Sequence, residues 1–546
     1  MDRVRVLVLG GYGFFGRRLV ERLLLQPGLE IIVAGRSAQS AEALVQSLSA
    51  SGAAALRSCV LDAGSATLAQ QLAALAPAVV VHTAGPFQGQ DHRVARACIT
   101  ARCHYIDLAD GRAFVQGIGA LHADALAAGV AVLSGASSVP ALSSAVVDDL
   151  ASGMACVESI DIGISPGNRT ERGLSTVAGV LSYCGQPIAA DGGTPVRGWS
   201  GAWSHDYPAP VGRRLLSPCD VPDLGLLPSR YPGRPSVRFG AGLEVRALHR
   251  VMNAMAWMAR VGIVKDWSRH AAVLKRMSEA FLSWGSDAGA MHVTVRGRDD
   301  DGVGRTREWS LVAERGDGPF VPTLAAAALV RRIAAGLPPT PGARPCMGEI
   351  GWQAILAEAQ GLAITAGETS RARFFDGALG EAYQRLDAPV RAFHDLRGRA
   401  ELHGEVETEA PAGALAALVG RLLGTPQAST RGALRFELHC DDAQQTWTRH
   451  FPHRTMRSRM RVDGSDIVET LGPVRLVMRL QESGGSLHMV LRSMHFLGIP
   501  CPGWLLPRIE AREHGAGGRM HFHVRAALPV VRQVAGYHGW LEVPRA

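Results

Sequence analysis

A cluster of glycines near the start of the chain carries the clearest chemical signal. The cluster comprises Gly10, Gly11, Tyr12, Gly13, Phe14, Phe15 and Gly16. It follows the apolar stretch Val4–Leu9 and precedes an amphipathic stretch, Arg17–Leu25, so a strand, a turn and a helix are expected in that order. Glycines spaced as G-x-G-x-x-G allow a tight turn, a close backbone approach to a pyrophosphate and close helix-on-strand packing. Because the first amides of the helix would bind phosphate, the pattern predicts a dinucleotide site.

The residues after the second expected strand, Glu30–Ala34, indicate which dinucleotide is bound. Enzymes that prefer NAD place Asp or Glu there, about 20 residues after the glycines, to bind the ribose 2′-hydroxyl. This chain has Arg36 and Ser37 instead. A guanidinium matches the oxygens of a 2′-phosphate, so the predicted cofactor is NADP, bound as NADPH. The alternative is that Arg36 is a solvated residue at the start of a helix.

Further apolar stretches alternate with helical patterns and predict the sheet that would hold this site. The predicted strands are Leu56–Asp62, Val79–Gly85, His104–Leu108 and Val130–Gly135, and the predicted helices include His92–Ala101 and Val115–Ala128. This alternation predicts an α/β fold with a doubly wound, parallel Rossmann-type sheet. Ligands of such sheets bind outside the carboxyl ends of the strands. The rule places at the rim of the site Asp62, Ala84, Gly85, Pro86, Phe87, Asp107 and the segment Ser134–Ser137.

Several segments together resemble the saccharopine dehydrogenase-like NAD(P)-binding family. They read GGYGFFG, AGRS, VVVHTAGPFQGQ, CHYIDLAD and SGASSVPALSS. The resemblance covers the first 150 residues closely and the chain up to residue 360 more loosely. It implies that Ala84–Phe87 flank the nicotinamide and that Asp107 lies near the substrate. Many members read G-x-D-P-G where this chain has Ser137-Ser138-Val139-Pro140, so the substrate end of the site is expected to differ.

The scarcity of lysine bears on the reaction. Lysine occurs only at Lys265 and Lys275, both outside the predicted nucleotide module. Arginine stays protonated and does not replace lysine as a general base or Schiff-base former. A Lys–His acid–base pair of the kind known in lysine-forming saccharopine dehydrogenases is therefore not expected, and saccharopine is not predicted as the substrate. The candidate proton donors are Asp107 and Tyr231, and the candidate substrate anchors are Arg230 and Asp220.

The middle of the chain is predicted to be an α/β substrate domain. Strands are expected at Ser159–Ile164, Ala290–Arg296 and Glu308–Ala313, with a turn at Arg298–Gly302. Residues 192–235 form an irregular stretch rich in Gly, Pro and Trp, which is typical of a substrate loop or of an exposed connection. His249–Trp267 carries Met and Trp at helical spacing, which favours a core helix, with a surface for an acyl chain or a membrane as the alternative. By the family resemblance, a helix at Pro322–Ala335 returns to the nucleotide domain.

The last third of the chain is predicted to be an antiparallel, β-rich α+β domain with a curved sheet. Helices are expected over Leu379–Phe393 and Leu415–Leu423, and strands over Ala400–Glu407, Leu434–Cys440, Thr446–Phe451, Met456–Val462, Arg475–Gln481, Leu487–Met494, Met520–Ala526 and Gly539–Val543. The segments WTRHF, ETLGP, LGIP and YHG resemble the bacterial domain-of-unknown-function family 4166, which carries no known activity. His521 and His523 alternate on a strand, but no carboxylate or Cys stands at ligand spacing, so no metal is predicted.

Length and composition bound the remaining possibilities. A chain of 546 residues exceeds one core, and we expect an NADP-binding domain at 1–150 completed by a helix returning near 320–360, a substrate domain at 151–318 and a C-terminal domain at 372–546. The boundary before the last domain falls near Thr365–Arg373. The net charge of +8 is dispersed, so no nucleic-acid partner is expected. Nine cysteines without a C-x-x-C pair fit reduced thiols in a cytosol, and no apolar run is long enough to span a membrane.

These observations predict a cytoplasmic, NADPH-preferring oxidoreductase that acts on a small-molecule or lipid-like substrate. Peripheral membrane or lipid contact and oligomer formation stay open at this point. Two alternatives also stay open. One is a trans-acting enoyl reductase-like enzyme of lipid metabolism, because the family includes lipid-pathway members. The other is a non-catalytic NADPH sensor that acts through the C-terminal domain.

Overall fold

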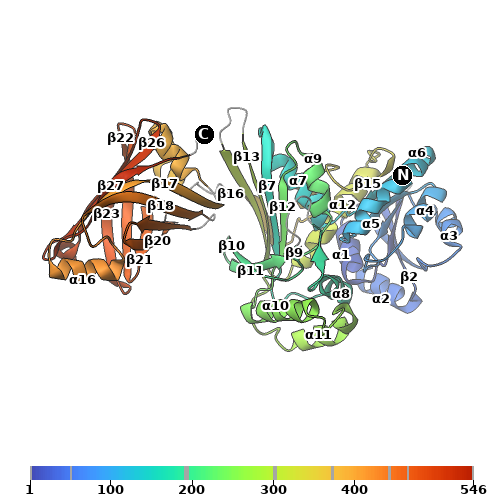
Figure 1. Cartoon of the computed structure of the whole chain (residues 1–546). Coiled ribbons are helices and arrows are strands. Elements are labelled where there is room, and N and C mark those ends of the chain that lie inside the picture. Colours follow the sequence, from blue (N-terminus) through green and yellow to red (C-terminus); the bar gives the residue numbers. More distant parts are fainter. Residues whose placement is uncertain are drawn as a thin grey trace. The chain divides into compact units, whose positions relative to one another are not determined.

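The chain divides into two compact units, Met1–Ser370 and Arg371–Ala546. The structure, a computed structural model, describes residues 3–49, 52–189, 196–298, 304–369, 374–396, 398–440, 444–463 and 466–543. Figure 1 labels the helices and strands of both units.

The first unit begins with a seven-stranded parallel sheet in the order β15-β6-β5-β4-β1-β2-β3. Its strands are β1 (Val4–Leu9), β2 (Leu29–Gly35), β3 (Ala55–Val60), β4 (Val79–His82), β5 (His104–Asp107), β6 (Ala131–Ser134) and β15 (Gly342–Pro345). On β1, Val6 and Val8 pack into one apolar cluster, whereas Leu7 and Leu9 pack into another on the opposite face. Both faces of the sheet are therefore covered, as a doubly wound fold requires, and the predicted fold class is confirmed.

Helices cover this sheet on its two faces (Figure 1). They are α1 (Phe14–Leu23), α2 (Ala38–Leu48), α3 (Leu68–Leu75), α4 (Arg93–Thr100), α5 (Arg112–Gly117), α6 (His122–Ala128) and α12 (Val321–Ala334). The helix predicted over Val115–Ala128 is interrupted by a 3₁₀ turn, Ile118–Leu121, because Gly117 and Gly119 lie inside the stretch and glycine disfavours a continuous helix. After the second sheet the chain returns: α12 packs against α1, and β15 pairs with β6.

A second, mixed sheet follows in the order β10-β11-β12-β7-β13-β14-β16. Its strands are β7 (Cys156–Ser165), β10 (Trp203–Tyr207), β11 (Gly212–Pro218), β12 (Ser236–Ala241), β13 (Gly289–Arg298), β14 (Gly304–Ala313) and β16 (Ile364–Thr369). Helices α7 (Ser143–Leu150), α8 (Leu174–Ser182), α9 (Asp223–Arg230), α10 (Arg246–Arg260), α11 (Ala271–Glu279) and α13 (Trp352–Ala357) belong to the same region, as does a two-stranded ribbon, β8 (Pro187–Ile188) with β9 (Val196–Arg197).

One prediction for this region needs correction. The stretch 192–235 is not an irregular loop, because β10 and β11 form an antiparallel hairpin in it and α9 follows. Its Pro and Gly residues sit largely in the connections between these elements, where they hid the short strands. The division between the two units falls after Ser370, inside the predicted boundary range Thr365–Arg373, and β16, which pairs with β14, ends just before it at Thr369. The predicted turn at Arg298–Gly302 lies outside the described residues beyond Arg298.

The second unit is an eleven-stranded antiparallel sheet that closes on itself, because β22 pairs with β23 as well as with β21. Its strands are β17 (Gly398–Glu409), β18 (Thr430–Cys440), β19 (Gln445–Phe451), β20 (Arg454–Asp463), β21 (Asp466–Leu471), β22 (Val474–Ser483), β23 (Ser486–Phe496), β24 (Ile499–Pro500), β25 (Arg508–Ala516), β26 (Arg519–Leu528) and β27 (Arg532–Leu541). Side chains that alternate along the strands, such as Leu434, Phe436 and Leu438, fill the interior of the resulting barrel. The antiparallel, β-rich prediction is confirmed.

Short helices accompany the barrel: α14 (Phe374–Leu379), the 3₁₀ segment Gly380–Arg385, α15 (Ala388–His394) and α16 (Ala414–Leu423). The single helix predicted over Leu379–Phe393 is thus two segments separated near Asp387, where Pro389 begins the next helix. The strands β21 and β25 are missing from the prediction. The apolar residues of β21 (DIVETL) do not alternate, and β25 (RIEAREHGA) carries few of them, so hydrophobic alternation marked neither strand.

Candidate nucleotide groove and adjoining polar cluster

The glycine cluster forms the turn between β1 and α1. Gly10 adopts a left-handed φ of 84°, and the amide of Gly13 donates to the carbonyl of Gly10 at 2.8 Å. A Cβ at Gly16 would lie 2.1 Å from the Gly10 carbonyl oxygen, so only glycine lets α1 approach the turn this closely. Gly13 is the N-cap of α1 and provides no side-chain cap, which leaves the start of the helix open to an anion.

A groove lies over this turn and brings together residues from four strand ends. Its lining consists of Leu9, Gly10, Tyr12, Gly13, Phe14, Phe15, Gly35, Arg36, Leu61, Asp62, Ala63, Thr83, Ala84, Gly85 and Ser175. Most of the predicted cofactor residues are in this set. Gly11 and Gly16 belong to the turn and make close backbone contacts within it, but they do not line the groove. The predicted cofactor residues Ser37, Pro86 and Phe87 are next to lining residues in the sequence and do not line the groove either. Thr83 and Ser175 were missed, because a lone hydroxyl residue gives no sequence signal.

Arg36 follows β2 directly and its side chain is exposed at the groove. In the described part of the chain no ion pair or hydrogen bond engages its guanidinium. Asp62, exposed at the end of β3, accepts a hydrogen bond from the amide of Gly64 at 3.0 Å. The end of β2 thus presents a cation to the groove, and the turn and the helix start fit the pyrophosphate of a dinucleotide.

The loop after β4 lies at the other end of the groove. Gln90 Nε2 donates to the carbonyls of Ala84 at 3.0 Å and Pro86 at 2.7 Å, which fixes the loop. Phe87 is buried against His82 and Phe114. This is the position that the family resemblance assigns to the nicotinamide.

A polar cluster adjoins this loop and is a better candidate for the chemistry than the residues predicted. Gln88 Nε2 lies 3.1 Å from Asp110 Oδ1 and 3.1 Å from the hydroxyl of Tyr183. The side chain of Asp110 is partly open to solvent. Desolvation by the surrounding protein nevertheless raises the pKa of its carboxyl. Burial likewise raises the pKa of the Tyr183 hydroxyl. The cluster joins loops after β4 and β5 to the end of α8, so it spans the two sheets of the first unit.

Asp220 belongs to the edge of this cluster. It forms an ion pair with Arg112, the first residue of α5, and burial raises the pKa of its carboxyl while Arg112 opposes that rise. The neighbouring Cys219 is buried, and its burial, together with the charges of Asp110 and Asp220, raises the pKa of its thiol. The predicted anchor Asp220 is thus already paired with a cation.

Asp107 does not have the position that was predicted for it. Its side chain is fully buried, and Oδ1 accepts hydrogen bonds from the amides of Ala109 and Gly135 and from the hydroxyl of Ser134. Burial raises the pKa of this carboxyl to about 6. It does not line the groove, so its geometry is that of a group that holds two loops together rather than one that meets the substrate.

Tyr231 and Arg230 also lie elsewhere. Arg230 forms two hydrogen bonds to Asp148, and the hydroxyl of Tyr231 donates to the same carboxylate. These contacts tie the end of α9 to α7, and neither residue lines the groove. That they act on the substrate stays a prediction, because a Tyr–Arg pair at the end of a short helix gives the same sequence pattern whether it binds a ligand or a neighbouring helix.

Comparison with known proteins agrees with both sequence resemblances. Residues 6–133 match the profile of the saccharopine dehydrogenase NADP binding domain, and residues 386–541 match that of a domain of unknown function, DUF4166. Both predicted resemblances are confirmed, and the first supports an oxidoreductase with a nicotinamide cofactor. A search among curated proteins found no match.

Solved structures that resemble the chain include several dehydrogenases. Apo saccharopine dehydrogenase (L-Glu forming) from Saccharomyces cerevisiae matches with 15% identity and a TM-score of 0.49, over 67% of this chain and 100% of that one. Amine dehydrogenase from Mycobacterium smegmatis matches with 11% identity and a TM-score of 0.36, over 63% and 94%. GenD2 from gentamicin A biosynthesis, in complex with NAD, has 14% identity, a TM-score of 0.28 and coverage of 56% and 72%.

Two further observations concern the described residues alone. No helix among them is both long and apolar enough to cross a bilayer. No group of three or more His, Cys, Asp or Glu side chains in the same part of the chain is arranged to hold a metal ion.

Proposed function

We propose that this chain, which joins a saccharopine dehydrogenase-type NADP-binding domain to a DUF4166 domain, is an NADPH-preferring oxidoreductase with an apolar, lipid-like substrate. The observation that carries the proposal is the position of Arg36. Its guanidinium stands at the end of β2, exposed at the groove, where an NAD-preferring site would hold a carboxylate. A planar cation there pairs with a 2′-phosphate through charge-assisted hydrogen bonds.

In this proposal one set of residues binds the cofactor and another residue transfers a proton. Bound NADPH would supply the hydride. The turn at Gly10–Gly16 and Arg36 hold the phosphates, and the loop Ala84–Phe87 borders the nicotinamide. Asp110, with its raised pKa and its hydrogen bond to Gln88, is the residue that we assign to hold the proton that a reduced oxygen or nitrogen would need.

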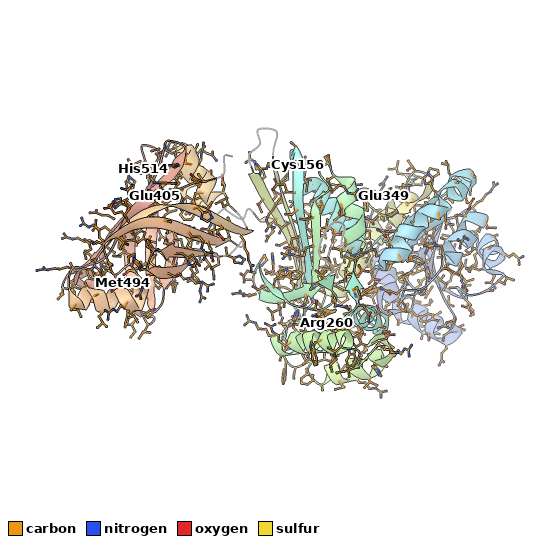
Figure 2. All side chains as sticks on the ribbon, in the orientation of Figure 1. Cys156, Arg260, Glu349, Glu405, Met494 and His514 are labelled. Atoms are coloured by element: carbon orange, nitrogen blue, oxygen red, sulfur yellow. The ribbon has the colours of Figure 1, made fainter. Side chains whose placement is uncertain are left out.

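A set of exposed apolar side chains on α10, on α11 and just after each of these helices supports a lipid-like substrate. We name it the α10–α11 patch; its exposed members are Val251, Trp257, Val261, Ile263, Val273, Met277 and Trp284. The segment 246–279 also carries Arg and Lys in excess over Asp and Glu, among them Arg260, which is labelled in Figure 2. Apolar side chains with flanking cations suit the surface of an anionic membrane. The Met and Trp residues predicted to form a core helix in His249–Trp267 therefore differ in burial: Met255 is buried, and Trp257 faces solvent.

Two experiments test the proposal. Steady oxidation of NADPH with a panel of carbonyl, imine and enoyl compounds is expected, with an apolar compound turned over fastest; binding of NADPH without any turnover would favour the sensor. Sedimentation with phosphatidylglycerol vesicles tests the patch. Trp257→Asp should lower the bound fraction several-fold, whereas Leu337→Asp, which changes an exposed leucine outside the patch, should not.

A further inference from the structure

The interior of the C-terminal barrel contains a cavity of about 130 Å³. Its wall is mainly apolar and includes the side chains of Met456, Met460, Met478, Met489 and Met520. An engineered cavity of about 150 Å³ in another protein, lined by Leu, Ile and Phe, stays dry and accepts benzene. Methionine is flexible and polarisable, so this wall can adapt to the shape of a guest. The space suits an apolar molecule with the bulk of a short aliphatic chain or a single ring.

Six polar side chains are among those that line this otherwise apolar space: Thr425, Arg449, Glu469, Arg512, Glu513 and Tyr537. Arg449 is 7% exposed, Glu469 9% and Tyr537 5%, and all three line the cavity. In the part of the chain that the structure describes, the Tyr537 hydroxyl has no hydrogen-bond partner. This hydroxyl therefore has its donor available to a ligand oxygen inside the cavity.

The surroundings of Arg449 show which kind of polar group would fit. Its Nη1 donates to Ser458 Oγ at 3.1 Å, and the guanidinium lies over the ring of Trp447 at 4.9 Å. Its Nη2 lies 4.0 Å from Glu469 Oε1, which is too far for a direct hydrogen bond. Arg449 and Glu469 therefore bring opposite charges to the same space, and the two charges compensate each other.

We propose that this barrel binds a small apolar ligand that carries one uncharged oxygen, such as a ketone or an alcohol. A carboxylate would come close to Glu469, and to Glu513, which also lines the cavity. An ammonium would come close to Arg449. In a water-poor interior either like-charge contact is costly, whereas a neutral oxygen accepts a hydrogen bond from Tyr537 or Arg449 without it. The site is separate from the nucleotide groove, so it does not depend on the function proposed for the first unit.

Isothermal titration calorimetry of the full chain with 2-octanone tests the ligand class. We expect saturable binding of 2-octanone, and binding of octanoate and octylamine that is at least tenfold weaker, because only the ketone avoids a like-charge contact. Absence of 2-octanone binding would overturn the proposal. Tighter binding of either charged compound would overturn the assignment of a neutral ligand.

Two neighbouring residues of β23 locate the site. Met489 lines the cavity, whereas Val490 is 41% exposed on the outer face of the barrel. Met489→Trp should fill the space and abolish 2-octanone binding, and Val490→Trp should leave it unchanged. Because both changes lie in the second unit, a selective loss cannot arise in the nucleotide groove. Unchanged binding in a folded Met489→Trp protein would place the ligand elsewhere and overturn the proposal.

Tyr537→Phe provides a test that does not depend on the fold tolerating a larger side chain. It removes only the hydroxyl that has no partner. The affinity for 2-octanone should fall about three- to tenfold, as expected for the loss of one hydrogen bond. An undiminished affinity would show that Tyr537 does not meet the ligand oxygen.

Discussion

The hydroxyl of Tyr12 accepts a hydrogen bond from the backbone amide of Ser37 at 3.0 Å. This contact joins the phosphate turn to the end of β2, across Gly35, where a Cβ would lie 2.4 Å from the Tyr12 ring. The position of Arg36 is therefore set by the same turn that would hold the pyrophosphate. The segment proposed to bind the pyrophosphate and the segment proposed to select the nucleotide are therefore held together by this hydrogen bond.

Gly13→Val should abolish NADPH binding and leave the fold intact. A Cβ at Gly13 would meet only the Gly10 carbonyl oxygen, at 3.0 Å, so the backbone can accommodate it while the larger side chain fills the groove. Fluorescence titration with NADPH measures the loss, and circular dichroism checks the fold. Gly119→Val is the matched control, because a Cβ there meets nothing within 4 Å. Native NADPH affinity in Gly13→Val would mean that the glycine turn is only structural.

Asp110→Asn should lower kcat/KM about a hundredfold or more while the Kd for NADPH stays unchanged, as expected for loss of a general acid. The raised pKa of Asp110 keeps it protonated to higher pH than an ordinary Asp. In the native protein kcat/KM should therefore fall as pH rises through that pKa, and this limb should vanish in the variant. Asp124→Asn, at an exposed position on α6, should keep the native profile. An identical pH profile in Asp110→Asn would remove Asp110 from the reaction.

Asp107 should make the stability of the first unit depend on pH. Its pKa is about 6 in the folded protein, above the ordinary value of 3.8, so the folded state binds this proton more tightly than the unfolded state. The contribution is present below about pH 4 and is lost as pH rises to about 6, up to about 3 kcal/mol in all. Urea unfolding from pH 4 to 7, followed through the transition that NADPH shifts, should show this loss in the native chain. Asp107→Asn should remove it; equal pH dependence in both proteins would contradict a buried, titrating Asp107.

A chain that ends at Ser370 should fold and bind NADPH with native affinity, because it keeps every residue of the groove. A chain that ends at Gly361 should be less stable, since it lacks β16 and the ion pair between Arg307 and Glu368. Thermal unfolding and NADPH titration of both chains test this. Loss of NADPH binding in a folded chain ending at Ser370 would show that the second unit is needed for the site.

The sequence predicts those parts of the molecule that depend on local pattern. The glycine turn needs close backbone contacts that only Gly10 and Gly16 permit, and buried parallel strands give unmistakable apolar runs, so the first sheet and the groove were predictable. Contacts between segments that are distant in the sequence were not predictable. Gln88, Asp110 and Tyr183 meet only after the second sheet has folded against the first, and no residue spacing records that meeting.

Closure of the barrel was hidden for a related reason. The pairing of β22 with β23 turns a curved sheet into an enclosed space, yet the two strands look like any hairpin in the sequence. The outward positions of barrel strands are polar, and in β25 the inward position Glu513 is polar too, so hydrophobic alternation fails there. The closure of the barrel, and therefore the cavity beside Tyr537, follows from strand pairing in the folded unit and could not be predicted from the sequence.

The measurement that tests the account most directly is the ratio of Kd values for NADH and NADPH, in the native chain and in Arg36→Asp. A charge-assisted contact of about 1.5–3 kcal/mol corresponds to a preference of about ten- to a hundredfold. We predict that the native chain prefers NADPH by that factor and that Arg36→Asp narrows or inverts it. Arg96→Asp, on α4 and away from the groove lining, should leave the ratio unchanged. Equal affinity of the native chain for both nucleotides would contradict the central claim.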